Sequence, residues 1–308
     1  MWLKCLYLIA SGLTLITSPV YAQHRAGMFP ASELPANQII TNISELRNSN
    51  RSSVELLQSD QLLGPLMPSN PRVGRESRRV WIFFMYEAST GAVIPNATMV
   101  LGPLQPRANS GGHDHDSTNR PKGSLSLHTG FTGASGLEFQ SIYTAPEVSG
   151  HVQSSISCTA PGYPPCDPGD YFVFVTAVQN LINLPPSSTY KLTGTKPIHV
   201  SNHWATASFA NKWMTVANAY FMEFGAVLSI NDISLPTGGM FDINQNWVPD
   251  HYEHRIGITA DIGTPPFRNV TFLKSMLLQE GITGRLTIHP PPGPPAHHWH
   301  IREFDTRE

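Results

Sequence analysis

The chain has 308 residues with 20 basic and 22 acidic side chains, so its formal net charge is −2. This balance excludes the strong positive field with which proteins attract nucleic acid, and we expect no nucleic-acid partner. The 27 prolines and 24 glycines indicate many turns, which is typical of a β-rich exported protein.

Residues 1–22 have the features of an export signal. Lys4 supplies the positive start, residues 6–16 are mostly apolar, and the segment ends at Ala22 with the small residue of a cleavage site. The apolar run is too short and too interrupted for a convincing membrane span, although a retained N-terminal anchor is the alternative. We therefore expect an exported protein, periplasmic or secreted, with no stable membrane span after signal cleavage.

Residues 23–77 form a polar segment with scattered Asn, Ser and Pro and only short apolar groups. This composition predicts a poorly ordered leader, with at most a short helix near residues 53–63.

Residues 78–200 have the pattern of short strands. Residues 79–86 are rich in aromatic and β-branched side chains, and Gly and Pro turns separate the runs that follow. These further runs are residues 97–101, 124–128, 137–143, 152–157 and 171–178. Roughly six or seven short strands in a stretch of this length predict an immunoglobulin-like β sandwich.

Two cysteines remain after removal of the signal, Cys158 and Cys166. In an oxidising compartment they should form a disulfide that pins the loop between them, and two free thiols are the alternative. Two cysteines alone cannot make a structural zinc site, so we assign them no metal.

From residue 201 the apolar period becomes helical. The members of one apolar stripe, spaced by three and four, are Phe209, Trp213, Val216, Ala217, Tyr220, Phe221 and Phe224. Residues 267–280 predict a second helix, which Gly281 ends. Short β-type pieces lie between and after the helices, so we predict an α+β domain over residues 201–308.

Histidine is concentrated in this domain. His254 precedes Asp261 by seven residues, a spacing that on one helix separates them by about 10 Å, too far for one ion. Gly257 allows a turn, so a bent strand–turn–strand is the geometry in which the two side chains meet.

His298 and His300 lie two residues apart, so in a strand both side chains emerge from the same face. One of them can bind a metal while the other handles protons. Two imidazoles and one carboxylate are the usual ligands of a catalytic zinc that keeps its fourth position for water. The sequence therefore predicts a zinc hydrolase.

The His-x6-Asp spacing with a late His-x-His resembles the LAS metallopeptidases, a group named for lysostaphin, D-alanyl-D-alanine carboxypeptidases and Sonic hedgehog. Residues 251–262, which read HYEHRIGITADI, are similar to the penicillin-insensitive murein endopeptidases of that group. Residues 232–239, DISLPTGG, also resemble the approach to their site. The resemblance covers about residues 199–303 and leaves out the predicted sandwich and the leader.

This resemblance implies that His254, Asp261 and His300 bind zinc and that His298 handles protons or stabilises the transition state. The D-alanyl peptidase branch has a Glu as general base where this chain has His297. The base therefore stays open, with His298 first and His297 second, because a His pKa lies near the working pH.

Three neighbours of the ligands are further candidates. His251 is a plausible catalytic neighbour or substrate contact. Arg255 suits binding of a substrate carboxylate and a surface ion pair equally well. Glu253 is next to a ligand, and in an extended segment its side chain alternates away from it, so we expect it to support a ligand from behind or to lie on the surface.

Two other groups of histidines favour structural interpretations. Residues 112–116, GHDHD, could bind a cation, but a solvated polar loop is the better interpretation. His199 and His203 could line a cleft, and we slightly prefer a structural role in capping the helix that follows.

The expected function is that of an exported zinc peptidase that hydrolyses the peptide cross-links of peptidoglycan or another peptide substrate. Whether it is an endopeptidase or a carboxypeptidase stays open. The alternative is a non-catalytic exported binding or adhesion protein that uses the sandwich and has a structural or lapsed metal site.

Overall fold

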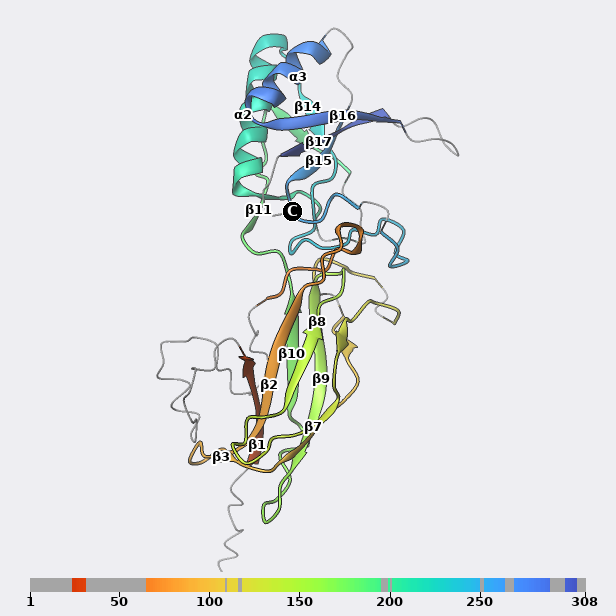
Figure 1. The fold of residues 1–308 in the computed structure, drawn as a ribbon. Helices are drawn as coiled ribbons and strands as arrows, with labels where there is room; N and C mark the ends of the chain where they lie inside the picture. Colours follow the sequence, from red (N-terminus) through yellow and green to blue (C-terminus); the bar gives the residue numbers. More distant parts are fainter. Residues whose placement is uncertain are drawn as a thin grey trace, which may run out of the picture.

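The computed structural model describes residues 24–31, 65–108, 110–115, 118–194, 199, 201–249, 252–263, 269–288 and 297–303. These residues form a mostly β structure of α+β class with several antiparallel sheets and two α-helices. A part built of strands lies at one end and a part with both helices at the other (Figure 1). We name them the strand region, β1 to β10, and the helix region, β11 to β17 with α2 and α3. None of the described helices is both long and apolar enough to cross a membrane.

Two five-stranded antiparallel sheets make up the strand region. The first sheet has the order β1 (His24–Pro30), β2 (Arg78–Glu87), β8 (Gln140–Thr144) and β6 (Ser124–Leu125), and β3 (Val93–Ile94) pairs with β2. The second has the order β10 (Tyr171–Thr176), β9 (Gly150–Thr159), β4 (Thr98–Leu101) and β7 (Thr129–Phe131), and β5 (Gln105–Pro106) pairs with β9.

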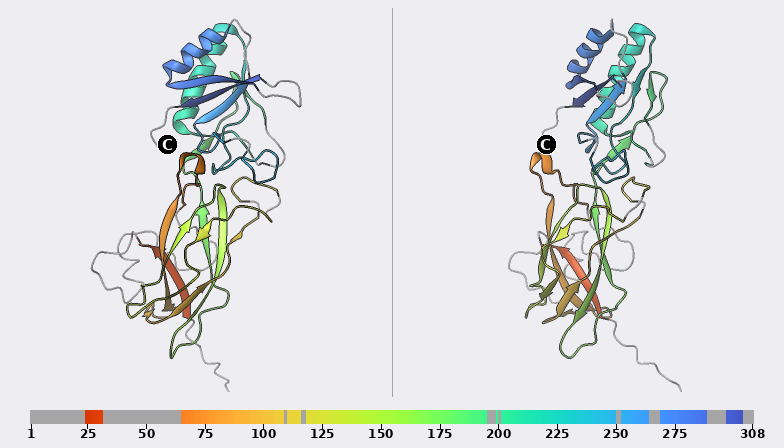
Figure 2. Two further views of the ribbon diagram at one scale, coloured as in Figure 1. Left: turned by 45° about the vertical axis from the view of Figure 1, so that its right-hand side comes forward. Right: turned by 90° about the vertical axis from the view of Figure 1, so that its right-hand side faces the viewer.

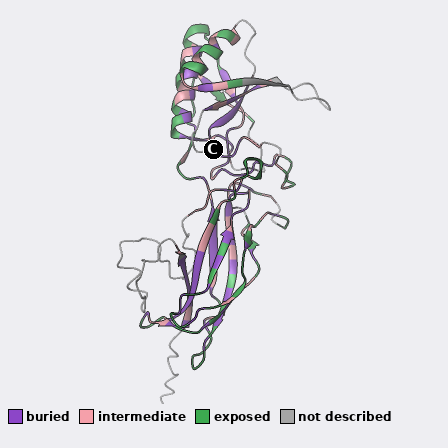
Figure 3. Cartoon of the chain, in the orientation of Figure 1, coloured by how far each residue is buried: buried purple, intermediate pink, exposed green. Residues whose placement is uncertain are grey.

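The two sheets contact each other through aromatic side chains. Trp81 lies 6.0 Å from Phe174 and Phe83 lies 5.1 Å from Phe172 between ring centroids, and all four belong to one buried cluster. Burial alternates along β9, as it does in a strand with one face on a core and the other on solvent. The core of this region therefore lies between the sheets, where Figure 3 shows buried residues along the strands.

The predicted disulfide between Cys158 and Cys166 is present, and both residues belong to this core. Cys158 lies near the end of β9, and the Cys166 N–H donates to the Cys158 carbonyl at 3.0 Å. The bond pins the intervening loop to the end of the strand, as its position in the sequence suggested.

The leader is more ordered than its composition predicted. Residues 24–30 form β1, which pairs with β2 along its full length. Arg25 pairs with the buried Asp170 at 2.5 Å, and the Leu66 N–H donates to the Val175 carbonyl at 2.9 Å. The expectation of poor order is wrong for residues 24–31 and 65–77, because long-range pairing with the sheets and burial of Ala26, Met28 and Phe29 order segments that the polar composition of the leader did not reveal. The predicted signal and the helix near 53–63 lie outside the described residues.

A five-stranded sheet forms the centre of the helix region. Its order is β12 (Tyr190–Leu192), β14 (Leu228–Ile230), β15 (Thr259–Gly263), β17 (His297–Glu303) and β16 (Ile282–Ile288). The first pair is parallel and the others are antiparallel. The helices α2 (Ala207–Phe224) and α3 (Val270–Gln279) lie on one face of the sheet (Figure 2) and share a buried cluster with it. The short strands β11 (Leu181–Asn183) and β13 (Trp204–Thr206) pair separately, and a 3-10 turn, η2, spans Pro71–Val73.

Both helices were predicted. The stripe of α2 is buried from Phe209 to Tyr220, whereas Phe221 is half-buried and Phe224 is exposed. The N-terminus of the helix is capped by Thr206, whose hydroxyl accepts from the Phe209 N–H at 3.1 Å. The expectation that His199 and His203 cap this helix is therefore wrong. Gly225 ends α2 in the left-handed conformation with φ 62°, which favours glycine.

The two regions are joined by a buried arginine. Arg255 is 4% exposed and donates to the Glu147 carboxylate at 3.0 Å, to the Glu147 carbonyl at 3.1 Å and to the Ser69 carbonyl at 2.6 Å. Val148 also forms an isolated bridge with Gly239. The junction is therefore held by directional bonds.

Candidate metal centre

Strands β15 and β17 bring a carboxylate and two imidazoles to one face of the sheet. Their antiparallel register sets Asp261 directly opposite His300 and Gly263 opposite His298. Trp299 and Ile301 alternate with the histidines and are buried in the helix-side core, 4% and 0% exposed. Because side chains alternate along a strand, His298 and His300 point away from the helices, as predicted.

His254 reaches the same place from the turn that precedes β15. Gly257, with φ 75°, turns the chain between His254 and β15, and its carbonyl accepts from the Thr206 N–H at 2.8 Å. His254 is 2% exposed, and its Nε2 lies 3.3 Å from Asp261 Oδ1. The predicted bend is present, with His254 in a turn and not on a strand end.

The three predicted ligands converge. One ligand atom from each of His254, Asp261 and His300 lies within 4.8 Å of the others. His300 Nδ1 is 2.8 Å from Asp261 Oδ1, and the two imidazole planes are almost perpendicular at 86°. These buried His and Asp side chains could hold a metal ion.

The ring nitrogen that faces away from Asp261 lies beside an oxygen of the protein in both imidazoles. His254 Nδ1 donates to the Ile233 carbonyl at 3.1 Å, and His300 Nε2 contacts the Glu253 carboxylate. A neutral imidazole that donates from one nitrogen can present a lone pair to a metal at the other, and the nitrogens that face Asp261 are His254 Nε2 and His300 Nδ1. Metal-binding histidines are oriented in this way. Without a metal, these same nitrogens can donate to the Asp261 carboxylate.

Glu253 contacts the ligand His300, one of the two places expected for it, although the expected alternation of its side chain away from the site is wrong. Alternation along an extended segment would have placed its side chain opposite His254, but residues 252–255 form a turn. The turn brings the Glu253 carboxylate to His300 Nε2.

The charges of the group favour a cation. Burial raises the pKa of Asp261, but its contacts with three imidazoles outweigh burial and hold this pKa well below its ordinary value, so the side chain is a carboxylate. Burial lowers the pKa of His254, while Asp261 and Asp232 raise it, and the net shift is upward. Asp232 is a further acidic neighbour, whose own pKa is raised by burial and by Asp261.

His298 lies beside the three ligands. Its Nε2 is 3.3 Å from Asp261 Oδ2, and its side chain is 12% exposed against 4% for Asp261. It is therefore close to the carboxylate and reachable from solvent. His251 and the side chain of His297, the other proposed catalytic residues, lie outside the described part of the chain.

Arg255 occupies a different place from either predicted one. Its guanidinium is buried in the junction, where Glu147 and the Ser69 carbonyl bind it, so it is not a surface ion pair. The guanidinium of Arg255 points into the strand region, and its hydrogen bonds are made to groups of the protein itself.

A second group of histidines also comes together. The expectation of a solvated loop is wrong for His113 and His115, whose side chains are 0% and 3% exposed. They lie with His199 and Asp242 in a buried group that shares no residue with the first. Local spacing could not reveal this group, because its members come from distant parts of the sequence.

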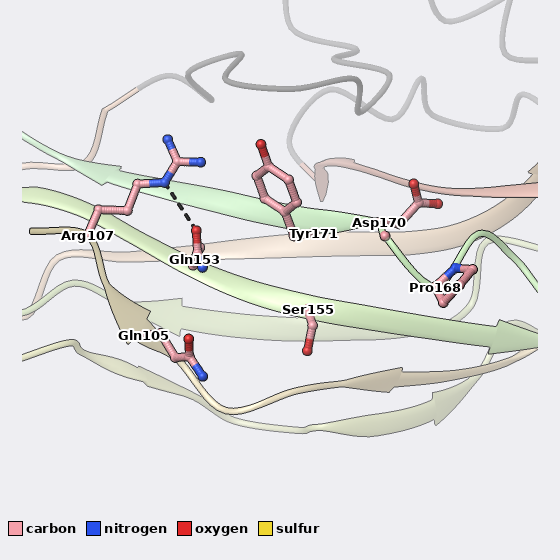
Figure 4. Close-up of a pocket in the computed structure, with 8 residues that line it drawn as sticks. Gln105, Arg107, Gln153, Ser155, Pro168, Asp170 and Tyr171 are labelled. Carbon is pink, nitrogen blue, oxygen red and sulfur yellow. Dashed lines mark hydrogen bonds between the residues drawn. The ribbon is translucent and has the colours of Figure 1, made fainter.

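A polar hollow of about 340 Å³ lies on the second sheet of the strand region (Figure 4). Arg107 Nε donates to the Gln153 side chain at 3.2 Å across part of it. Its lining contains neither histidine nor cysteine, and we assign it no chemistry.

No protein-family model matches the chain, and no curated protein matches it.

Proposed function

We propose that the chain is an exported zinc-dependent peptidase of the LAS type, with His254, Asp261 and His300 as the zinc ligands. The observation that carries the proposal is the convergence of these buried side chains, with one nitrogen of each imidazole facing Asp261. Two imidazoles and a carboxylate leave one position of a tetrahedral zinc for water, which is the ligand count of a catalytic site.

A zinc ion in such a site lowers the pKa of a bound water towards about 7 and polarises the scissile carbonyl. The side chains of the protein orient the ligands and transfer protons. Asp261 is held as a carboxylate by its imidazole contacts, and the Ile233 carbonyl fixes the orientation of His254. His298, beside Asp261 and partly exposed, is the residue that we propose takes a proton from the attacking water and passes one to the leaving amine.

The substrate class is the peptide cross-links of peptidoglycan, reached after export by a signal at residues 1–22. This part of the proposal is supported by the similarity of residues 251–262 to the murein endopeptidases and by the disulfide between Cys158 and Cys166, which suits an oxidising compartment. We further propose that residues 78–200 are an immunoglobulin-like sandwich that positions residues 201–308 on the substrate.

Digestion of purified, cross-linked peptidoglycan tests the proposal. The zinc-loaded protein should release shorter muropeptides, detected by mass analysis, and a chelator should abolish the release until zinc is restored. Asp261→Ala should be inactive, while His128→Ala, which removes an exposed histidine of the strand region, should match the wild type. Release that survives both the chelator and Asp261→Ala would contradict the metal mechanism, and no release by the zinc-loaded wild type would contradict the substrate.

A further inference from the structure

A second set of metal-type side chains gathers where three segments of the chain meet. His113 and His115 come from the loop between β5 and β6, His199 from the segment before β13, and Asp242 from the loop between β14 and β15. His113 and His199 also form a β-bridge. The loop belongs to the strand region and the other two segments to the helix region.

We propose that His113, His115, His199 and Asp242 form a second zinc site, structural in kind, that fastens the strand region to the helix region. This second site is distinct from the proposed peptidase site, because the two have no residue in common.

The distances between the ligand atoms suit one tetrahedral ion. Asp242 Oδ1 lies 3.1 Å from His113 Nδ1, 3.4 Å from His115 Nε2 and 3.6 Å from His199 Nε2. His113 Nδ1 and His115 Nε2 are 3.3 Å apart. Zinc–ligand bonds of about 2.0–2.1 Å in a tetrahedron set neighbouring ligand atoms about 3.3 Å apart. The four measured separations scatter around that value.

Hydrogen bonds do not account for this crowding. Within the described part of the chain, Asp242 Oδ1 and His199 Nε2 are buried and have no hydrogen-bond partner. Three ring nitrogens therefore surround one carboxylate oxygen with little hydrogen bonding to it. A buried carboxylate left in this state is costly, and a cation between the four atoms would satisfy all of them.

The group is closed to solvent. The side chains of His199 and Asp242 are 1% and 0% exposed. The Trp247 ring lies 4.3 Å from the His115 ring, the Phe241 ring lies 4.9 Å from the His199 ring, and the Trp247 N–H donates to Asp242 Oδ2 at 2.9 Å. Four protein ligands without an open position define a structural zinc site, in contrast to the three ligands beside the partly exposed His298.

The loop that carries His113 and His115 is held at both ends. Arg120 donates to the carbonyls of Arg107 at 3.2 Å, Ser110 at 2.8 Å and Ser149 at 2.5 Å. These bonds hold the loop beside the start of β9. The remaining ligands, His199 and Asp242, come from the helix region.

Zinc stoichiometry of the full chain tests the proposal with zinc alone as the probe. After saturation with zinc and removal of the excess, the wild type should hold two equivalents and Asp261→Ala one. Asp261→Ala combined with His115→Ala should hold none, whereas Asp261→Ala combined with His128→Ala should still hold one. Zinc-free Asp261→Ala protein would overturn the second site.

A second measurement with cobalt in place of zinc shows whether the second site has formed in the variant. In Asp261→Ala, one bound Co²⁺ should give the intense visible absorption of a tetrahedral site, and its absence would overturn the proposal. The stoichiometry also distinguishes failure of the proposed peptidase site from failure of the second site. A wild type that holds one equivalent, kept in Asp261→Ala and lost in His115→Ala, supports the second site alone.

Discussion

Two histidines on one face of β17 have different surroundings. His300 lies between the carboxylates of Asp261 and Glu253, whereas His298 contacts the other oxygen of Asp261 and is partly exposed. We therefore predict that His298→Ala keeps stoichiometric zinc and slows cross-link cleavage by about 10²–10⁴-fold, the usual contribution of a positioned acid or base. Metal analysis and initial cleavage rates on the same preparation measure both quantities.

The matched variant is His300→Ala, on the same strand and face, which should lose both zinc and turnover. Unchanged turnover in His298→Ala would assign proton transfer to another side chain. Loss of zinc from His298→Ala would make His298 a ligand.

Local spacing predicted part of the candidate site, and the family resemblance linked His300 to Asp261, which lies 39 residues earlier. His298 and His300 follow strand alternation, and Gly257 allows the turn that His254 needs. Asp242 has no such signal, because only the fold brings it to the histidines of the second group. The polar character of the loop over residues 112–116 suggested solvation, whereas tertiary contacts bury its two histidines.

At the scale of elements, the turn before β15 positions His254. Gly257 has φ 75°, and a Cβ there would lie 2.6 Å from Leu181 Cδ2 and 3.0 Å from the Ala205 Cα. We predict that Gly257→Ala shifts this turn, destabilises the fold by about 2–3 kcal/mol through strain and overlap, and weakens zinc binding. Denaturant unfolding and a zinc titration measure the two effects.

Gly74→Ala is the control for backbone strain. Gly74 has φ 68°, but no atom lies within 4 Å of the position that an added Cβ would take, so the substitution carries the conformational cost of about 1–2 kcal/mol alone. It should leave zinc affinity unchanged. Equal effects of the two substitutions on zinc binding would show that the Gly257 turn does not position His254.

The helix α2, whose apolar pattern persists over several turns, was predicted better than the strand β1. The stripe of α2 spans several turns, and its 3.6-residue period overrides the scatter of single residues. β1 was missed because it directly follows the expected signal and opens a mostly polar segment. Its order comes from pairing with β2 and from the ion pair of Arg25 with Asp170, which are long-range contacts.

At the scale of the molecule, the Arg255 junction should couple the two regions. Removing a buried guanidinium leaves the Ser69 and Glu147 carbonyls without their donor, so Arg255→Met should destabilise the chain by about 3 kcal/mol. Arg78→Met removes an exposed arginine paired with Glu76 and should cost less than about 1 kcal/mol. The denaturant midpoints of Arg255→Met and Arg78→Met measure the two losses of stability. Equal losses would contradict a coupling role for Arg255.

Zinc should stabilise the whole molecule through both proposed sites. A ligand present at about 100 times its Kd adds about 2.7 kcal/mol of stability per site if it binds only the folded chain. We predict that zinc raises the Tm of the wild type more than that of Asp261→Ala, and that the variant keeps a clear rise because the group around Asp242 is intact. Calcium should leave both unchanged, since it prefers oxygen ligands. A rise in the wild type that vanishes in Asp261→Ala would mean that zinc acts at the β15–β17 site alone, and the two regions would then be held by Arg255 and its neighbours without a metal.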